Sequence, residues 1–115
     1  MVLKNSWKAD YTRELEHAVA ARSTGNEGMA RVCARRAAGI VIGEYLHRRG
    51  DAGQDENAYT RLSRFMSLPN IDARFKEVCS HLLMKVDPAH RLPGDPDLLS
   101  EVNWLAQALL NETNN

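Results

Sequence analysis

Residues 30–46, ARVCARRAAGIVIGEYL, decide the fold of this chain. Apolar side chains, most of them small, recur there at helical spacing: Ala30, Ala34, Ala37, Ala38, Val41 and Ile42. Because small side chains allow another helix to approach closely, we expect a central, packed helix over residues 27–49. Gly39 and Gly43 each cost about 1 kcal/mol of helix stability relative to alanine. Their spacing of four residues indicates that a close approach is the reason they are tolerated.

One further helix is predicted before the central one, over residues 5–22. Its apolar residues recur every four positions and form a stripe that drifts slowly around the helix: Trp7, Tyr11, Leu15 and Val19. Gly25 suits the C-terminal cap of this helix, and Asn26 suits the N-terminal cap of the next.

Three shorter helices are predicted after the central one, over residues 55–67, over residues 70–86 and from Pro96 onward. Pro69 and Asp87-Pro88 end the first two, and Asp95 with Pro96 starts the third. The side chains expected to face the core are Tyr59, Leu62, Phe65, Met66, Ile71, Phe75, Val78, Cys79, Leu82, Val86, Leu98, Leu99, Val102, Trp104, Leu105 and Leu109.

No segment alternates apolar and polar residues with the period of a strand, and no internal repeat is visible. The sequence therefore predicts an all-α fold, an antiparallel up-and-down bundle of about five helices. We expect residues 1–115 to form a single domain of ordinary size.

Composition narrows the class of protein. No apolar run approaches the roughly 18 residues needed to span a bilayer, and the polar N-terminus does not resemble a secretory signal, so we expect a cytoplasmic protein without membrane contact. Lys and Arg balance Asp and Glu at 15 each, which argues against a protein that coats nucleic acid. The charge is uneven: residues 1–50 carry nine basic and five acidic side chains, whereas residues 51–115 carry six and ten.

Cysteine and histidine spacing predicts no metal site and no cofactor. Cys33 and Cys79 lie far apart within apolar helical patterns, and we interpret both as buried free thiols. The four histidines, at positions 17, 47, 81 and 90, are scattered along the chain. They would have to converge from separate elements to bind zinc.

Arg74 and His81 form the first candidate site. They are seven residues apart, nearly two helical turns, so both side chains leave the same face of the predicted helix. A guanidinium can hold a phosphate while an imidazole moves a proton, which is the chemistry of RNA cleavage. The alternative is a structural role, in which Arg74 pairs with a carboxylate such as Glu77 and His81 points to solvent.

Arg31, Arg35 and Arg36 form the second candidate site, as ligand-binding residues on the central helix. Three arginines beside small residues can line a groove that binds an anion. The alternative is an exposed ladder of ion pairs, since Glu27 precedes Arg31 by four residues.

The alanine-rich run from Ala30 to Leu46 resembles the second helix of HEPN domains, and the five-helix organisation is compatible with that family. The resemblance implies a homodimer and, in many relatives, a nucleotidyltransferase partner in a toxin–antitoxin-like pair. Some members resemble metal-independent ribonucleases with an Arg-x(4–6)-His motif in the dimer cleft. Arg74 and His81, with six residues between them, fit the longest spacing, while Phe75 stands where the commoner motif has a polar residue.

Three functional hypotheses follow. The first is a HEPN-like, dimeric domain that binds a nucleotidyltransferase partner or a nucleotide-type ligand. The second is a metal-independent ribonuclease that uses Arg74 and His81. The third is a helical bundle that serves only protein–protein interaction.

Overall fold

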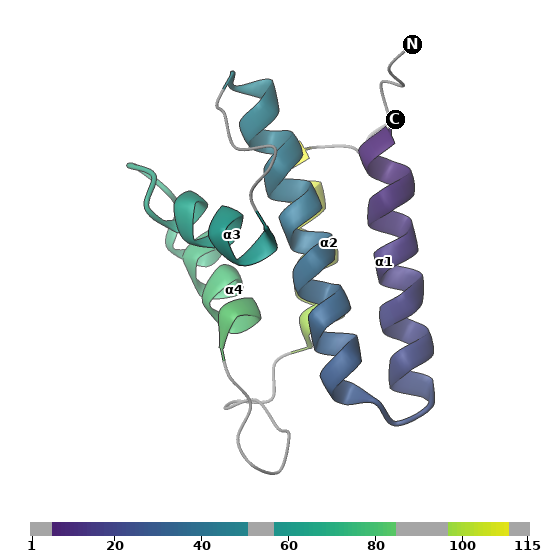
Figure 1. Ribbon diagram of the computed structural model, residues 1–115. Helices are drawn as coiled ribbons and strands as arrows, with labels where there is room; N and C mark the ends of the chain where they lie inside the picture. Colours follow the sequence, from purple (N-terminus) through teal and green to yellow (C-terminus); the bar gives the residue numbers. More distant parts are fainter. Residues whose placement is uncertain (1–5, 51–56, 85–96, 111–115) are drawn as a thin grey trace.

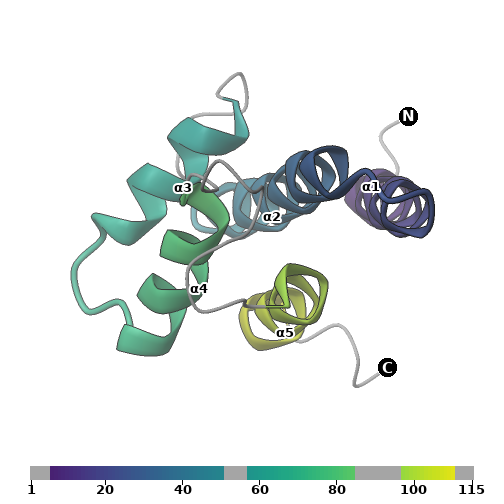
Figure 2. The ribbon, with the colours of Figure 1, turned by 90° about the horizontal axis from the view of Figure 1, so that it is seen from below.

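Helix α2 (Glu27–Arg48) lies at the centre of a bundle and packs against each of the other four helices. The computed structural model describes residues 6–50, 57–84 and 97–110. The surrounding helices are α1 (Ser6–Ser23), α3 (Ala58–Met66), α4 (Ala73–Leu83) and α5 (Leu98–Leu110). Figure 1 shows α1 antiparallel to α2 along one side, with α3 and α4 on the other. Figure 2 shows α5 on a third side of α2, between α4 and α1.

The predicted fold class is confirmed: the chain is an all-α antiparallel bundle, with five helices and no strand in the described ranges. Among these helices none is long and apolar enough to cross a membrane. The boundaries of the helices lie within about three residues of the predicted ones, and α5 begins at Leu98, two residues after the predicted start. There the cap is Asp97, whose carbonyl accepts the first helical bond from Glu101 and whose carboxylate accepts from the Ser100 amide at 3.3 Å. The predicted cap, Asp95, and Pro96 lie outside the described residues.

Helix ends elsewhere follow the sequence signals. Gly25 adopts a positive φ of 82°, and the Met29 amide donates to the Asn26 side chain at 3.1 Å, as predicted for the α1–α2 turn. Asn57 and Asp72 cap α3 and α4 in the same way, through the amides of Thr60 and Arg74. Each cap satisfies a backbone donor that the first turn of a helix leaves unpaired.

The small residues of α2 form the middle of the core, as predicted. Ala34, Ala37 and Ala38 are at most 1% exposed. The two glycines face α3: a Cβ atom at Gly39 would lie 2.6 Å from the Cβ atom of Ala58, and one at Gly43 would lie 2.7 Å from the guanidinium of Arg61. The close approach inferred from their spacing is therefore the approach of α3 to α2.

One residue of the predicted α1 stripe and one predicted core residue are exposed. Val19 is 57% exposed, because a spacing of four residues advances about 40° beyond a full turn each time and carries the α1 stripe out of the interface by its fourth member. Ala18 is fully buried in its place. Tyr59 is also 57% exposed, because its neighbour Ala58 takes the inward position against α2.

Candidate functional site

Helix α4 presents two faces, and its polar one carries the first candidate site. Val78, Cys79 and Leu82 are fully buried against the core. The spacing of seven residues then places Arg74 and His81 on a common side, and both reach the same residue, Glu101 of α5.

His81 is held by Glu101. Its Nδ1 atom lies 2.8 Å and 2.9 Å from the two carboxylate oxygens, and the side chains of His81 and Glu101 are only 21% and 12% exposed. Because a carboxylate only accepts hydrogen bonds, Nδ1 must carry the hydrogen, which leaves the lone pair of the neutral ring on Nε2. Glu101 stands in the first turn of α5, where the helix dipole favours a negative charge.

Arg74 lies beside this pair. Its Nη1 atom is 3.1 Å from Glu77 and 4.0 Å from Glu101, and the guanidinium lies over the Trp104 ring at 4.9 Å from the centroid. The side chain remains 47% exposed. The pairing with Glu77 is what a purely structural arginine would make. His81, in contrast, does not point freely to solvent as that alternative expected.

The packing of Phe75 explains why the residue that follows Arg74 is apolar. Its ring packs edge-on against Phe65 at 5.9 Å between centroids and lies tilted against Trp104 at 5.1 Å. Tyr45 of α2 extends the row by packing edge-on against Phe65. The aromatic row therefore joins α2, α3, α4 and α5 and fixes the ring on which the Arg74 guanidinium rests.

The sequence did not predict Glu101 and Trp104 as site residues. They are three positions apart, so they leave one side of α5, and this spacing was the available signal. Nothing in the sequence indicated that this side of α5 would face the polar side of α4. The contact therefore emerged only with the packing of the helices.

The three arginines of the second candidate site do not lie together: two of them contact α4 and the third is exposed. Arg31 donates to the Met84 carbonyl at 3.1 Å, and Arg35 donates to the Leu82 carbonyl at 2.9 Å, so both guanidinium groups cap the C-terminal end of α4. Arg36 is exposed on the surface of α2. Glu27, the expected partner of Arg31 in an ion-pair ladder, bonds to Arg22 at 3.2 Å.

Burial and the neighbouring Arg31 make the environment of Arg35 unfavourable for its charge. Burial lowers the pKa of Arg35 below its usual range, and the positive charge of Arg31 lowers it further. Arg31 also has a buried Nε atom without a hydrogen-bond partner. Two guanidinium groups held close together at the negative end of α4 are well placed to stabilise that helix end.

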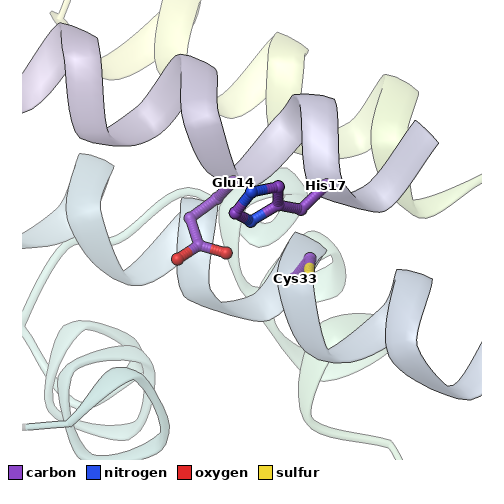
Figure 3. A group of neighbouring side chains, drawn as sticks. All are labelled: Glu14, His17 and Cys33. Carbon is purple, nitrogen blue, oxygen red and sulfur yellow. The ribbon is translucent and has the colours of Figure 1, made fainter. Parts of the chain in front are cut away.

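A third group of polar side chains lies between α1 and α2. Glu14, His17 and Cys33 place one oxygen, one nitrogen and one sulfur atom within 4.8 Å of one another (Figure 3). Sequence spacing predicted no metal site, and this cluster was missed because Cys33 joins it from a different helix. The available signal was Glu14 and His17, three residues apart on one face of α1.

The open side of α1 carries two depressions. One, of about 200 Å³, lies between α1 and α5 and is lined by Trp7, Lys8, Tyr11, Thr12, Asn103, Ala106 and Gln107. The indole nitrogen of Trp7 and the hydroxyl of Tyr11 are buried there without a hydrogen-bond partner. Burial raises the pKa of Tyr11 to about 12.

The other depression is a shallow apolar groove of about 360 Å³ along α1, lined by Thr12, Leu15, Glu16, Val19 and Ala20.

Comparisons of the chain with protein-family models, with curated proteins and with solved structures found no match.

Proposed function

We propose that this domain cleaves RNA without a metal ion, with His81 as the general acid–base, Arg74 as the phosphate-binding group and Glu101 as the residue that positions His81. The observation that carries the proposal is the convergence of Arg74 and His81 on Glu101, with Nδ1 of His81 held at 2.8 Å. An imidazole oriented by a carboxylate is a recurrent arrangement for moving protons. The resemblance of residues 30–46 to HEPN domains supports the same reaction.

The reaction follows from the two nitrogens of the ring. Nε2 of His81 takes the proton of a ribose 2′-hydroxyl, and the 2′-oxygen forms a bond to the adjacent phosphorus. The bond from phosphorus to the 5′-oxygen breaks, and the imidazolium returns the proton to that oxygen. The products are a 2′,3′-cyclic phosphate and a free 5′-hydroxyl. Glu101 stabilises the imidazolium while it exists.

Arg74 binds the phosphate in this proposal. Its guanidinium has five N–H donors, and the half-exposed side chain leaves part of them open to a ligand. The Trp104 ring beneath it limits the orientations of the guanidinium plane. A phosphate competes with Glu77, which is 55% exposed and therefore easily displaced by solvent or ligand.

The test is cleavage of a single-stranded RNA in EDTA by the wild type and by His81→Ala, Arg74→Ala and Glu101→Gln. We expect a 2′,3′-cyclic phosphate product, a loss of about 10²- to 10⁴-fold for His81→Ala, and a smaller loss for Glu101→Gln. The exposed His47→Ala and Arg13→Ala are matched controls and should retain full activity.

An inactive wild type would refute the ribonuclease proposal. Equal activity in the wild type and in the His81 and Arg74 variants would refute it as well, because the cleavage would then come from another source. Circular dichroism of each variant confirms that the helices remain.

A second role, as an interaction domain, is supported by the outer side of α1. Val19 is 57% exposed beside a groove that is almost wholly apolar, and exposed apolar surface of this kind is typical of protein contacts. We propose that a second copy of the chain covers this side and forms a homodimer. A nucleotidyltransferase is the competing occupant, and in that alternative no second copy covers this side of α1 in the isolated domain.

A further inference from the structure

Glu14 and His17 of α1 face Cys33 of α2 across the interface of the two longest helices. The spacing of three residues brings the two α1 side chains onto one side of the helix, and Cys33 approaches from below them in Figure 3. The three ligand atoms lie within 4.8 Å of one another. The cluster is separate from Arg74, His81 and Glu101, which join α4 to α5.

The three side chains of the cluster differ in how far they are buried. Cys33 is 2% exposed, Glu14 is partly buried, and His17 is exposed. The Oε1 atom of Glu14 is buried and has no hydrogen-bond partner. An unpaired carboxylate oxygen in such a place is costly, and coordination of a cation would satisfy it. The exposed imidazole leaves an open path from solvent to the ligand atoms.

We propose that Glu14, His17 and Cys33 bind a divalent transition-metal ion of the Zn²⁺ class, with a fourth position open to water. The donor set decides the class, because thiolate and imidazole favour zinc and its neighbours over Mg²⁺ and Ca²⁺, which require oxygen ligands. Three protein ligands with one open position are typical of zinc sites that hold a water or a substrate.

The site needs little rearrangement. Bonds of about 2.0–2.3 Å place the ligand atoms of a tetrahedral zinc site about 3.3–3.8 Å apart. The side chains of Glu14 and His17 therefore close by about 1 Å, and the exposed position of His17 allows it to rotate. On binding, the Cys33 thiol releases its proton to solvent and forms the sulfur–metal bond. The thiolate and the Glu14 carboxylate then balance the two positive charges of the ion.

Bound metal would connect α1 to α2 through three side chains. Because a ligand that binds the folded state alone stabilises it, Zn²⁺ should raise the melting temperature of the chain. This effect does not depend on RNA cleavage, so a negative result for the metal site leaves the ribonuclease proposal unaffected, and the reverse also holds.

The test is titration of the full, untagged, EDTA-treated chain with Co²⁺ and Zn²⁺. We expect one ion per chain, a thiolate-to-cobalt charge-transfer band, visible bands of four-coordinate cobalt, and a higher melting temperature with Zn²⁺. Cys33→Ala should remove the charge-transfer band. His17→Gln and Glu14→Gln should each weaken Zn²⁺ affinity at least ten-fold, and the exposed position of His17 makes its variant safe for folding.

Matched controls remove the same groups elsewhere. Cys79→Ala, His47→Gln and Glu16→Gln should each leave the metal affinity within about two-fold of the wild type. Absence of a charge-transfer band in wild-type Co²⁺ spectra would overturn the proposal. Unchanged Zn²⁺ affinity in both His17→Gln and Glu14→Gln would overturn it equally, because the thiol would then bind alone.

Discussion

Gly39 of α2 lies so close to Ala58 of α3 that a Cβ atom on the glycine would be 2.6 Å from the Cβ atom of the alanine and 2.9 Å from its Cα atom. Real Cβ atoms do not approach backbone atoms to this distance. The Gly39 carbonyl also accepts a hydrogen bond from the Arg61 guanidinium at 3.2 Å. The first turns of α3 are thus seated directly on the backbone of α2.

Gly39→Ala should destabilise the protein although alanine is the better helix former. Helix α3 must move away from α2, and overpacking of this kind costs about 1–3 kcal/mol. Gly28→Ala, in the same helix, has only the Asn26 side chain within 4 Å of the added methyl, at 3.8 Å. We expect it to be neutral or to stabilise by up to about 1 kcal/mol. Urea unfolding of both variants checks the prediction, and equal free energies of unfolding would contradict it.

Arg35→Met should destabilise the protein more than Arg36→Met. Arg35 caps α4 through the Leu82 carbonyl at 2.9 Å, and loss of a charged hydrogen bond to a partly buried acceptor costs about 1–2 kcal/mol. The exposed Arg36 should change the free energy of unfolding by less than about 0.5 kcal/mol. If an anion stabilises the wild type and the Arg35→Met protein equally, the arginines are caps and not ligands.

Asp97 should make the stability fall in acid. Hydrogen bonds from the Ser100 hydroxyl and amide hold the pKa of Asp97 below its usual range, and Arg22, with Nη1 at 3.7 Å, adds to this effect. A carboxyl group whose pKa is lowered by folding stabilises the folded state above about pH 4, its unfolded value. That contribution is lost as the pH falls through the lower folded value.

Asp97→Ala should therefore cost about 0.5–2 kcal/mol at neutral pH through the lost cap. The difference between wild type and variant should shrink as the pH falls toward 2. Thermal unfolding across that range measures it, and a difference that stays constant with pH would count against the charged cap.

Glu77→Gln should strengthen RNA binding. Glu77 holds Arg74 at 3.1 Å and competes with a phosphate for the same guanidinium. Removal of an exposed competing charge is worth up to about 1 kcal/mol, or about two- to five-fold in affinity. Fluorescence anisotropy at low salt measures the change against Glu16→Gln, an exposed glutamate on α1. Weaker binding by the Glu77 variant would mean that the phosphate does not reach Arg74.

The isolated domain should form a dimer that Val19→Glu weakens. A charge placed on the exposed apolar side of α1 cannot be solvated within an interface between copies. Light scattering should give about twice 12.9 kDa for the wild type at high micromolar concentration and a lower mass for the variant. A 12.9 kDa wild-type particle at that concentration would exclude the homodimer.

Local signals predicted the helices well because they act over a few residues. Asn26 caps α2, as predicted from its residue type, and the small residues of α2 lie in the core. Val19, the last residue of the predicted α1 stripe, is exposed because the drift of a four-residue repeat carries it about one third of a turn out of the interface. The periodicity of α1 predicted the drift of the stripe but not the residue at which the stripe leaves the interface.

The candidate site was less predictable because its contacts cross between helices. Arg74 and His81 could be placed on one face from their spacing, but Glu101 becomes their shared partner only when α5 packs against α4. The same holds for Cys33, whose neighbours Glu14 and His17 belong to another helix. Helical periodicity defines the faces of each helix but not which faces meet.

The two cysteines are shielded from solvent by different parts of the bundle. Cys79 is fully buried in the core, and burial raises the pKa of its thiol to about 12, whereas Cys33 lies outside the main core cluster, beside Glu14 of α1. Opening of α1 alone would uncover Cys33, while Cys79 requires the core itself to come apart. A thiol reagent in excess should therefore label the chain in two kinetic phases. The first reports how often α1 leaves α2, and the second reports global unfolding of the bundle.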